Sequence, residues 1–358
     1  MDLEQLLATV PSDLELAVLL GLIARQPCLI YGNDDSINNL ASELALIVSD
    51  KFKLSYAVLE PSDLQSVDTF VEAILDDTHH FADDADFDNS DSEAAATTLR
   101  SRIANVSFRG GACSHVEQQT LDNRMVVNVI IAKNFNYASH DVQIQVMDLI
   151  RKHRVFSKTT VHPVPKLFLF LPIVSISTMH VRINGQLNDR IFISHRHKPE
   201  DGFPNVEDME MDDPFRSASL SRSRSSTQHH IGKDSLDRLA ELGKQVTITP
   251  EVRRHLQDIV VFLRMERGVD SGITPYSNVC FVDLAKYLAP LHGIDYVTPS
   301  LLELAAKKVF PHRLIVAEPE RERSTQFGSD IGAVRQYMRG LEPEHVIDAV
   351  LAKVPNPR

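Results

Sequence analysis

The sequence lacks the features of membrane and secreted proteins. Its 358 residues contain no uncharged apolar run of the roughly 18 residues that a membrane-spanning helix needs. The first ten residues carry two acids and no base, whereas a signal peptide begins with basic residues. The three cysteines lie far apart without CxxC or CxxH spacing, which excludes a disulfide scaffold or a structural zinc motif. These absences predict an intracellular protein, cytoplasmic or nuclear, without a membrane span.

Clusters of basic residues are also missing. The chain has 37 Lys and Arg against 49 Asp and Glu, which gives a formal net charge of -12. Two stretches, 76–93 and 200–213, hold fifteen of these acids and no base, so the rest of the chain is close to neutral. Phosphate neutralisation requires clustered Lys and Arg, and direct nucleic-acid binding is therefore not predicted.

Hydrophobic periodicity predicts an α/β part at the N-terminal side of the chain. Apolar runs at 27–31, 53–59, 125–132 and 166–174 are typical of strands buried on both faces. Segments with helical periodicity alternate with these runs. The alternation predicts a three-layer α/β fold, with a parallel sheet covered by helices on both faces.

Composition divides the chain into four parts. Residues 1–195 are predicted to form the α/β domain, with an acidic loop at 83–93. Residues 196–245 are first acidic and then rich in Ser and Arg, which is typical of a disordered insertion. Residues 246–320 are predicted to form a helical domain, and 321–358 a C-terminal helical extension.

A single glycine follows the first predicted strand, in the string GNDDSINN from Gly32 to Asn39. This order of elements resembles the AAA+ ATPases of the MoxR and magnesium-chelatase group, which have a P-loop nucleotide-binding α/β domain and a helical lid. In those proteins the same position carries a glycine-rich phosphate loop such as GPPGTGKT. By this resemblance, Asn38 replaces the lysine and Asn39 the threonine. Asp34 and Asp35 lie where phosphate would bind.

A second match follows the third predicted strand. Family members carry the phrase DEINRASPKVQ, and this chain reads KNFNYASHDVQ from Lys133 to Gln143. The resemblance implies that Lys133 replaces the aspartate that holds magnesium. It also implies that Asn134 replaces the glutamate that activates water.

Strings in the second half of the chain extend the resemblance, which covers roughly 1–195 and 245–315. The string QLNDRIF resembles the family's LDRF segment and makes Arg190 the counterpart of its arginine. GIDYVTP and VFPHR resemble lid strings. Where the lid carries a sensor arginine in SPRA, this chain has TPYS, so Tyr276 takes that position.

A narrower resemblance is to the fungal maintenance of telomere capping protein 2 family. It is carried by the string VRRHLQDIVVFLRMER and by Phe327-Gly328-Ser329-Asp330. The resemblance implies a genetic link to telomere capping and no established chemistry.

The lost motif residues predict a protein that does not hydrolyse nucleotide. An ATPase needs glycine-rich backbone around the phosphates, a lysine, magnesium ligands and a residue that orients water. At least four of these groups are missing, so we predict a non-catalytic interaction or scaffold protein with protein partners, no catalytic residue, no metal and no cofactor. The alternative is an ATPase of the magnesium-chelatase type that binds ATP and magnesium weakly or unusually. A further hypothesis is that Lys133 pairs with Asp34 or Asp35. An unrelated α/β arrangement is also left open.

Other patterns have structural and functional interpretations. The histidine pairs at 79–80, 195/197 and 229–230 are interpreted as surface residues rather than zinc ligands, because no four-ligand spacing accompanies them. Asp189 and Arg190 are interpreted as a structural salt bridge rather than as a trans-acting arginine pair in a ring. The serines between Arg216 and Ser226 are either phosphorylation sites or part of an unmodified linker.

Overall fold

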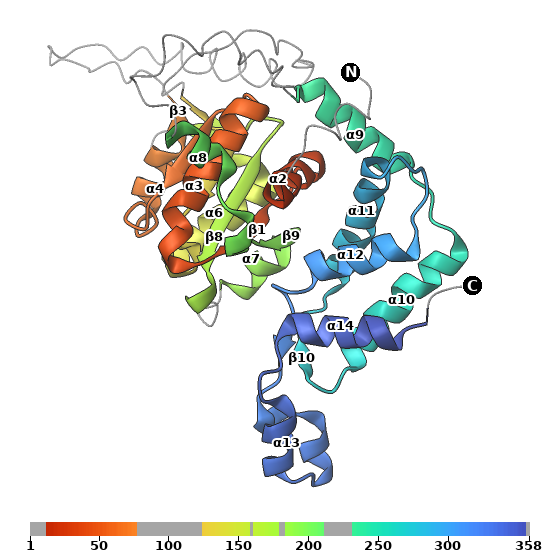
Figure 1. Ribbon diagram of the computed structural model, residues 1–358. Helices are drawn as coiled ribbons and strands as arrows, with labels where there is room; N and C mark the ends of the chain where they lie inside the picture. The colour runs from red at the N-terminus through yellow and green to blue at the C-terminus, as the bar shows by residue number, and fades with distance from the viewer. Residues whose placement is uncertain (1–11, 77–123, 158–159, 179–182, 211–230, 356–358) are drawn as a thin grey trace, which may run out of the picture.

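The computed structural model describes residues 12–76, 124–157, 160–178, 183–210 and 231–355. An α/β domain forms the N-terminal part, and a set of helices that follows it in the chain lies beside it (Figure 1). Two segments singled out from the sequence, the acidic loop at 83–93 and the serine-rich segment between Arg216 and Ser226, lie outside the described residues.

A parallel sheet of five strands forms the centre of the α/β domain. Its order is β2-β5-β8-β1-β9, and every neighbouring pair is parallel. The strands are β1 (Cys28–Gly32), β2 (Tyr56–Leu59), β5 (Val129–Ala132), β8 (Leu169–Ser175) and β9 (Ile193–Arg196). Four of them fall in the predicted apolar runs, whereas the edge strand β9 was not predicted.

Both faces of the sheet are buried, which confirms the predicted three-layer fold. Ile30 of β1 belongs to a core cluster with side chains of α2 and α3, while its neighbour Leu29 belongs to a second cluster with α4 and α6. Adjacent residues of a strand point to opposite faces, so one apolar run supplies both cores. The helices of this domain are α2 (Asp13–Ala24), α3 (Ile37–Leu46), α4 (Val67–Ala73), α6 (His140–Lys152), α7 (Gly185–Arg190) and α8 (Pro204–Glu210).

Threonine-proline pairs start three helices of the C-terminal part. Thr249, Thr274 and Thr298 each accept a hydrogen bond from a backbone N–H in the first turn, and a proline follows each of them. Proline fits this position because its missing N–H would have no partner within the helix. The elements are α9 (Lys233–Gln245), α10 (Pro250–Met265), β10 (Val269–Ser271), α11 (Pro275–Leu291), α12 (Pro299–Val309), β11 (Ile315–Val316), α13 (Ile331–Met338) and α14 (Pro343–Lys353).

The expected disordered insertion at 196–245 differs from the structure at both ends. Helix α8 occupies one end, where the buried Glu43 of α3 accepts hydrogen bonds from the backbone N–H groups of Asn205 and Val206. At the other end, α9 buries Leu236, Leu239 and Gly243. Their spacing of three and four residues is helical. Residues 211–230, between the two helices, lie outside the described part.

The α/β domain and the C-terminal helices share one continuous core. Helix α11 packs on α2, and α12 packs on β9. The same apolar cluster contains Leu14 of α2 and Phe281 of α11. Helix α13 lies apart from this core, below α14 in Figure 1.

Candidate functional site

The carboxyl ends of β1 and β8 form the edge at which the sequence places the nucleotide motifs. The connection after β1 runs through α3 to β2, the strand at one lateral end of the sheet. The connection after β8 runs to β9, the strand at the other lateral end. Two adjacent strands with oppositely directed connections form a crevice, which is the usual ligand position in open α/β sheets. The candidate site is therefore the segment after Gly32 together with the segment after Ser175.

The segment after Gly32 does not form an open phosphate loop. Asp34–Ser36 form a short 3-10 helix that leads directly into α3. None of the described residues 33–39 has a positive φ, so the backbone lacks the alternating geometry of an anion nest. Gly32 has a packing role, because a Cβ built there would lie 2.7 Å from Leu40 Cδ2.

Asp34 is bound by the neighbouring strand end. Ser177 donates a short hydrogen bond to Asp34 Oδ2, and the hydroxyls of Ser175 and Ser177 lie 3.0 Å apart. Hydrogen bonding by Ser175 and Ser177 lowers the pKa of Asp34. The carboxylate is thus ionised at neutral pH and faces the edge where a phosphate would bring further negative charge.

Lys133 pairs with Glu60, not with Asp34 or Asp35, so the hypothesis drawn from the sequence was wrong on this point. Its Nζ lies 2.6 Å from Glu60 Oε1 and 3.1 Å from Asn38 Oδ1, and only 13% of its side chain is exposed. Glu60 follows β2, which neighbours β5, and Lys133 follows β5. Asp34 and Asp35 follow β1, from which β5 is separated by β8.

Double-mutant cycles can distinguish a Lys133–Glu60 pair from a Lys133–Asp35 pair. Because Glu60 is 54% exposed, we expect a coupling energy of only about 0.5–1 kcal/mol between Lys133→Met and Glu60→Gln. The measurement is urea unfolding of the parent, both single variants and the double variant. The matched cycle of Lys133→Met with Asp35→Asn should give additive changes. Coupling in this second cycle and none in the first would contradict the pairing.

The other residues of the KNFNYASHDVQ phrase have structural roles. Asn134 adopts φ 49° and ψ 44°, a left-handed conformation that asparagine tolerates better than most residues. The buried Asn136 donates from Nδ2 to the backbone oxygen and the hydroxyl of Thr178 after β8. Gln143 accepts from the backbone N–H of Asn184. These bonds tie the β5–α6 connection and the start of α6 to the segment between β8 and α7.

Arg190 and Tyr276 come together, but at the opposite edge of the sheet from Gly32 and Lys133. The guanidinium carbon of Arg190 lies 4.7 Å from the centroid of the Tyr276 ring. The Tyr276 hydroxyl donates to Gln26 Oε1 at 3.2 Å, just before β1 begins. The predicted Asp189–Arg190 salt bridge is absent among the described ion pairs. Asp189 instead lies 3.9 Å from the Nε of Arg313.

Sequence reasoning missed the role of Arg313, which was noted only as part of the VFPHR string. Its side chain is buried and donates to the backbone oxygens of Asp189, in the last turn of α7, and of Ile191, in the link to β9. The preceding His312 contacts the Ile191 oxygen through Nε2 at 3.2 Å. This turn after α12 therefore connects the C-terminal helices to the α/β domain.

The interpretation of His195 and His197 as surface residues is also wrong. His195 lies on β9 and His197 directly follows it, with 2% and 5% exposure, and Lys308 Nζ is 3.2 Å from His195 Nδ1. Burial and the nearby Lys308 lower the pKa of His195 to about 3. The other interpreted histidine pairs, 79–80 and 229–230, lie outside the described residues. Within the described ranges, no group of three or more His, Cys, Asp or Glu is placed to hold a metal ion.

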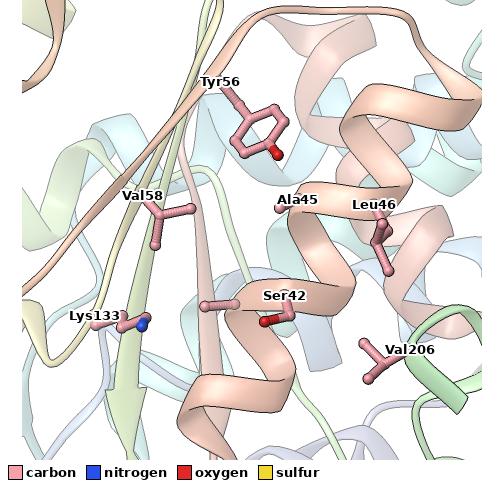
Figure 2. A pocket seen from close by; sticks show the side chains of 8 residues that line it. Ser42, Ala45, Leu46, Tyr56, Val58, Lys133 and Val206 are labelled. Atoms are coloured by element: carbon pink, nitrogen blue, oxygen red, sulfur yellow. The ribbon is translucent and has the colours of Figure 1, made fainter. Parts of the chain in front are cut away.

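A cavity of about 440 Å³ lies between α3, β2 and the start of α8 (Figure 2). It is mostly apolar, with the Lys133 side chain at one end. The lining residues are Ala41, Ser42, Ala45, Leu46, Tyr56, Val58, Lys133 and Val206. Ser42 and Lys133 supply the only side-chain hydroxyl-and-amine combination besides Tyr56 in this lining, and no described hydrogen bond joins Ser42 to Lys133. None of the helices in the described part is both long and apolar enough to cross a membrane.

Comparisons with known proteins identify the fold. Residues 262–331 match the family model described as the AAA lid domain. A structure from Cytophaga hutchinsonii, described as a candidate ATPase, is similar with a TM-score of 0.60 and 14% identity, covering 99% of this chain and 94% of that one. A full-length MCM homologue from Methanopyrus kandleri gives a TM-score of 0.43 at 14% identity, covering 84% of this chain and 55% of that one. No curated protein matches the sequence. The lid match and the first structure confirm the predicted AAA+ fold, with a parallel-sheet domain followed by a lid.

Proposed function

We propose that this chain is a non-catalytic AAA+-like protein, a pseudo-ATPase that acts by binding other proteins. The observation that carries the proposal is the internal pairing at the carboxyl edge of the sheet. Asp34 is bound by Ser177, and Lys133 is bound by Glu60 and Asn38. Asp34 and Lys133 thus already have partners within the protein, and the Lys133–Asn38 bond joins the magnesium-ligand position to the phosphate-loop position.

Electrostatics at this edge oppose nucleotide binding. A triphosphate would meet Asp34 and Asp35, both exposed, at the end of β1. The one cation of the two motifs, Lys133, is held by Glu60 and would have to leave that pair. Removing one electrostatic stabiliser from an active site costs about 3–4 kcal/mol in transition-state energy. Several absent groups together therefore reduce hydrolysis below a useful rate, even if their effects are not additive.

We expect ATP neither to stabilise the protein against heat nor to be hydrolysed by it. A ligand at about a hundredfold its Kd stabilises a protein by about 2.7 kcal/mol and raises Tm by several degrees. We expect about 5 mM ATP with magnesium to leave Tm unchanged within about 1 °C, and phosphate release to stay at the level of a Lys133→Ala variant. That variant is the matched control for contaminating ATPases. Saturable ATP binding with turnover that depends on Lys133 would establish the alternative, a weak ATPase of the magnesium-chelatase type.

Protein binding is the activity that the remaining surfaces support. The apolar cavity beside β2 and the lid helices offer surfaces without catalytic groups. Membership of the fungal maintenance of telomere capping protein 2 family is part of the proposal. Its support is the string in α10 and the Phe327-Gly328-Ser329-Asp330 turn before α13. Affinity purification of the full chain, followed by identification of the bound proteins, tests this part separately.

A further inference from the structure

A second pocket lies at the amino-terminal edge of the sheet, opposite the edge that carries Gly32 and Lys133. Its volume is about 500 Å³. Gln26, just before β1, borders it. Arg151 and His153 also border it, because α6 starts at the carboxyl edge of the sheet and ends at the amino-terminal edge. Arg190 and Tyr276 complete the polar part of the lining. The pocket is therefore separate from the nucleotide-like site.

The lining of this second pocket is cationic. It contains Arg25, Arg151, Arg190 and His153, and no Asp or Glu is part of it. Arg25 pairs with Asp237 at 2.6 Å, and both side chains are exposed. Within the described part of the chain, Arg151 and Arg190 have no carboxylate at ion-pair distance. Two guanidinium groups are thus available to an added anion.

Helix dipoles account for part of this charge but not for all of it. Arg25 caps α2, while Arg151 and Arg190 occupy the last turns of α6 and α7. Cations are stabilised at such carboxyl ends, each of which carries about half a negative charge. Each guanidinium carries a full positive charge, so the positive charge of the three arginines is larger than the negative charge of the three helix ends.

Arg190 is held in a fixed orientation. One face of its guanidinium lies against the Tyr276 ring, and the Tyr276 hydroxyl is bonded to Gln26. Burial raises the pKa of Tyr276, so its hydroxyl keeps its proton. Arg190 also hydrogen-bonds the Tyr276 side chain, and stacking on an aromatic ring leaves the other in-plane N–H groups of an arginine free to donate. A preorganised arginine loses less freedom when it binds an anion.

We propose that this pocket binds a small phosphate-bearing anion of diphosphate size. Arg151 and Arg190 donate charge-assisted hydrogen bonds to its oxygens, and Gln26 and Tyr276 border it. Guanidinium groups match tetrahedral phosphate oxygens in a bidentate manner, which a lysine ammonium does not do. The inference does not rest on the pseudo-ATPase proposal, because the two sites lie at opposite edges of the sheet.

The test is calorimetric titration of the full chain with inorganic pyrophosphate in magnesium-free buffer. We expect a submillimolar Kd that weakens as salt is raised. Arg151→Gln and Arg190→Gln should each weaken binding about tenfold, the effect of losing one charge-assisted hydrogen bond. The double variant should show no binding. The exposed Arg254→Gln on α10 is the matched control and should bind like the parent.

Two outcomes would overturn the inference. One is pyrophosphate affinity that persists in the double variant, and the other is loss of affinity in Lys133→Met at the opposite edge. Unfolding curves of each variant show whether the fold is retained. An additional phosphate titration measures whether a single phosphate is enough, and equal affinity for both anions would refute the diphosphate size. ATP turnover at the Gly32 edge would refute the pseudo-ATPase proposal alone.

Discussion

Arg313→Met is expected to lower the free energy of unfolding by about 3–5 kcal/mol, the usual result of breaking a buried charged network. Arg313 is 3% exposed and donates to the backbone oxygens of Asp189 and Val309, as well as to Ile191. Methionine has a similar length but no donor, so these carbonyl groups lose a partner within the core. Urea unfolding followed by circular dichroism measures the change.

Two variants control this measurement. Arg313→Lys keeps the charge but not the planar group that reaches several acceptors, so its stability should fall between those of the parent and Arg313→Met. Arg254→Met makes the same substitution at an exposed position of α10 and should change stability by less than about 0.5 kcal/mol. Equal, small effects at both positions would show that the Arg313 bonds do not stabilise the fold.

The connection through Arg313 also bears on how the two parts act together. The residue lies after α12, while its acceptor Asp189 lies in the last turn of α7 and its acceptor Ile191 lies between α7 and β9. A second contact supports the same joint, since Ser194 of β9 donates to the backbone oxygen of Lys308 in α12. In the AAA+ fold the lid follows the sheet domain, and here buried polar bonds hold them together. Under the proposed function, these bonds would hold the lid against the sheet domain without nucleotide.

The sheet could be predicted from the sequence where strands are continuous apolar runs. β8 is such a run, and all seven of its residues are buried. β9 is equally well buried at its first three positions, but it contains Ser194, His195 and Arg196. Polar side chains remove the apolar signal that identifies a strand. Pairing with β1 and contact with α12 stabilise β9 instead.

The sequence predicts at which edge of the sheet the candidate site lies, but not which side chains contact one another there. Gly32 and Lys133 follow strands that the sequence identifies, so their position at one sheet edge could be expected. The partner of Lys133 depends on strand order, because β8 lies between β1 and β5. The sequence contains no local signal for this order. The same reason explains why Arg190 and Tyr276, far apart in the chain, were not expected to touch.

Acid is expected to destabilise the protein well above the pH at which carboxylates protonate. The pKa of His195 in the fold is about 3, lowered from the usual 6.5 of histidine by burial, Lys308 and His197. Between these two values the unfolded chain binds a proton that the folded chain does not. Stability is therefore complete above about pH 6.5 and falls as the pH is lowered towards 3. This histidine alone lowers the free energy of unfolding by about 2 kcal/mol at pH 5.

Two further histidines with lowered pKa values, His197 and His312, are also expected to lower the stability of the fold in acid. Burial lowers the pKa of His197, and burial together with Arg313 lowers that of His312. All three lie on or beside β9 or in the turn that contacts the α7–β9 link. A proton on His195 or His312 would add charge beside Lys308 or Arg313, whereas His197 has the acids Asp201 and Glu43 nearby and its pKa is lowered by burial. The joint between the sheet and the lid is therefore the region expected to open first in acid.

His195→Asn tests this expectation, because the amide oxygen can accept from Lys308 but the side chain does not titrate. Urea unfolding at about pH 7.5 and about pH 5 should show a smaller loss of stability in the variant than in the parent, by about 2 kcal/mol. His140→Asn, at the exposed start of α6, is the matched control and should lose as much stability as the parent. If His195→Asn also loses as much as the parent, the buried histidine is not the source of the acid sensitivity. Since Nε2 of His195 has no hydrogen-bond partner among the described residues, its protonated ring would remain unpaired, which is the physical reason for expecting the difference.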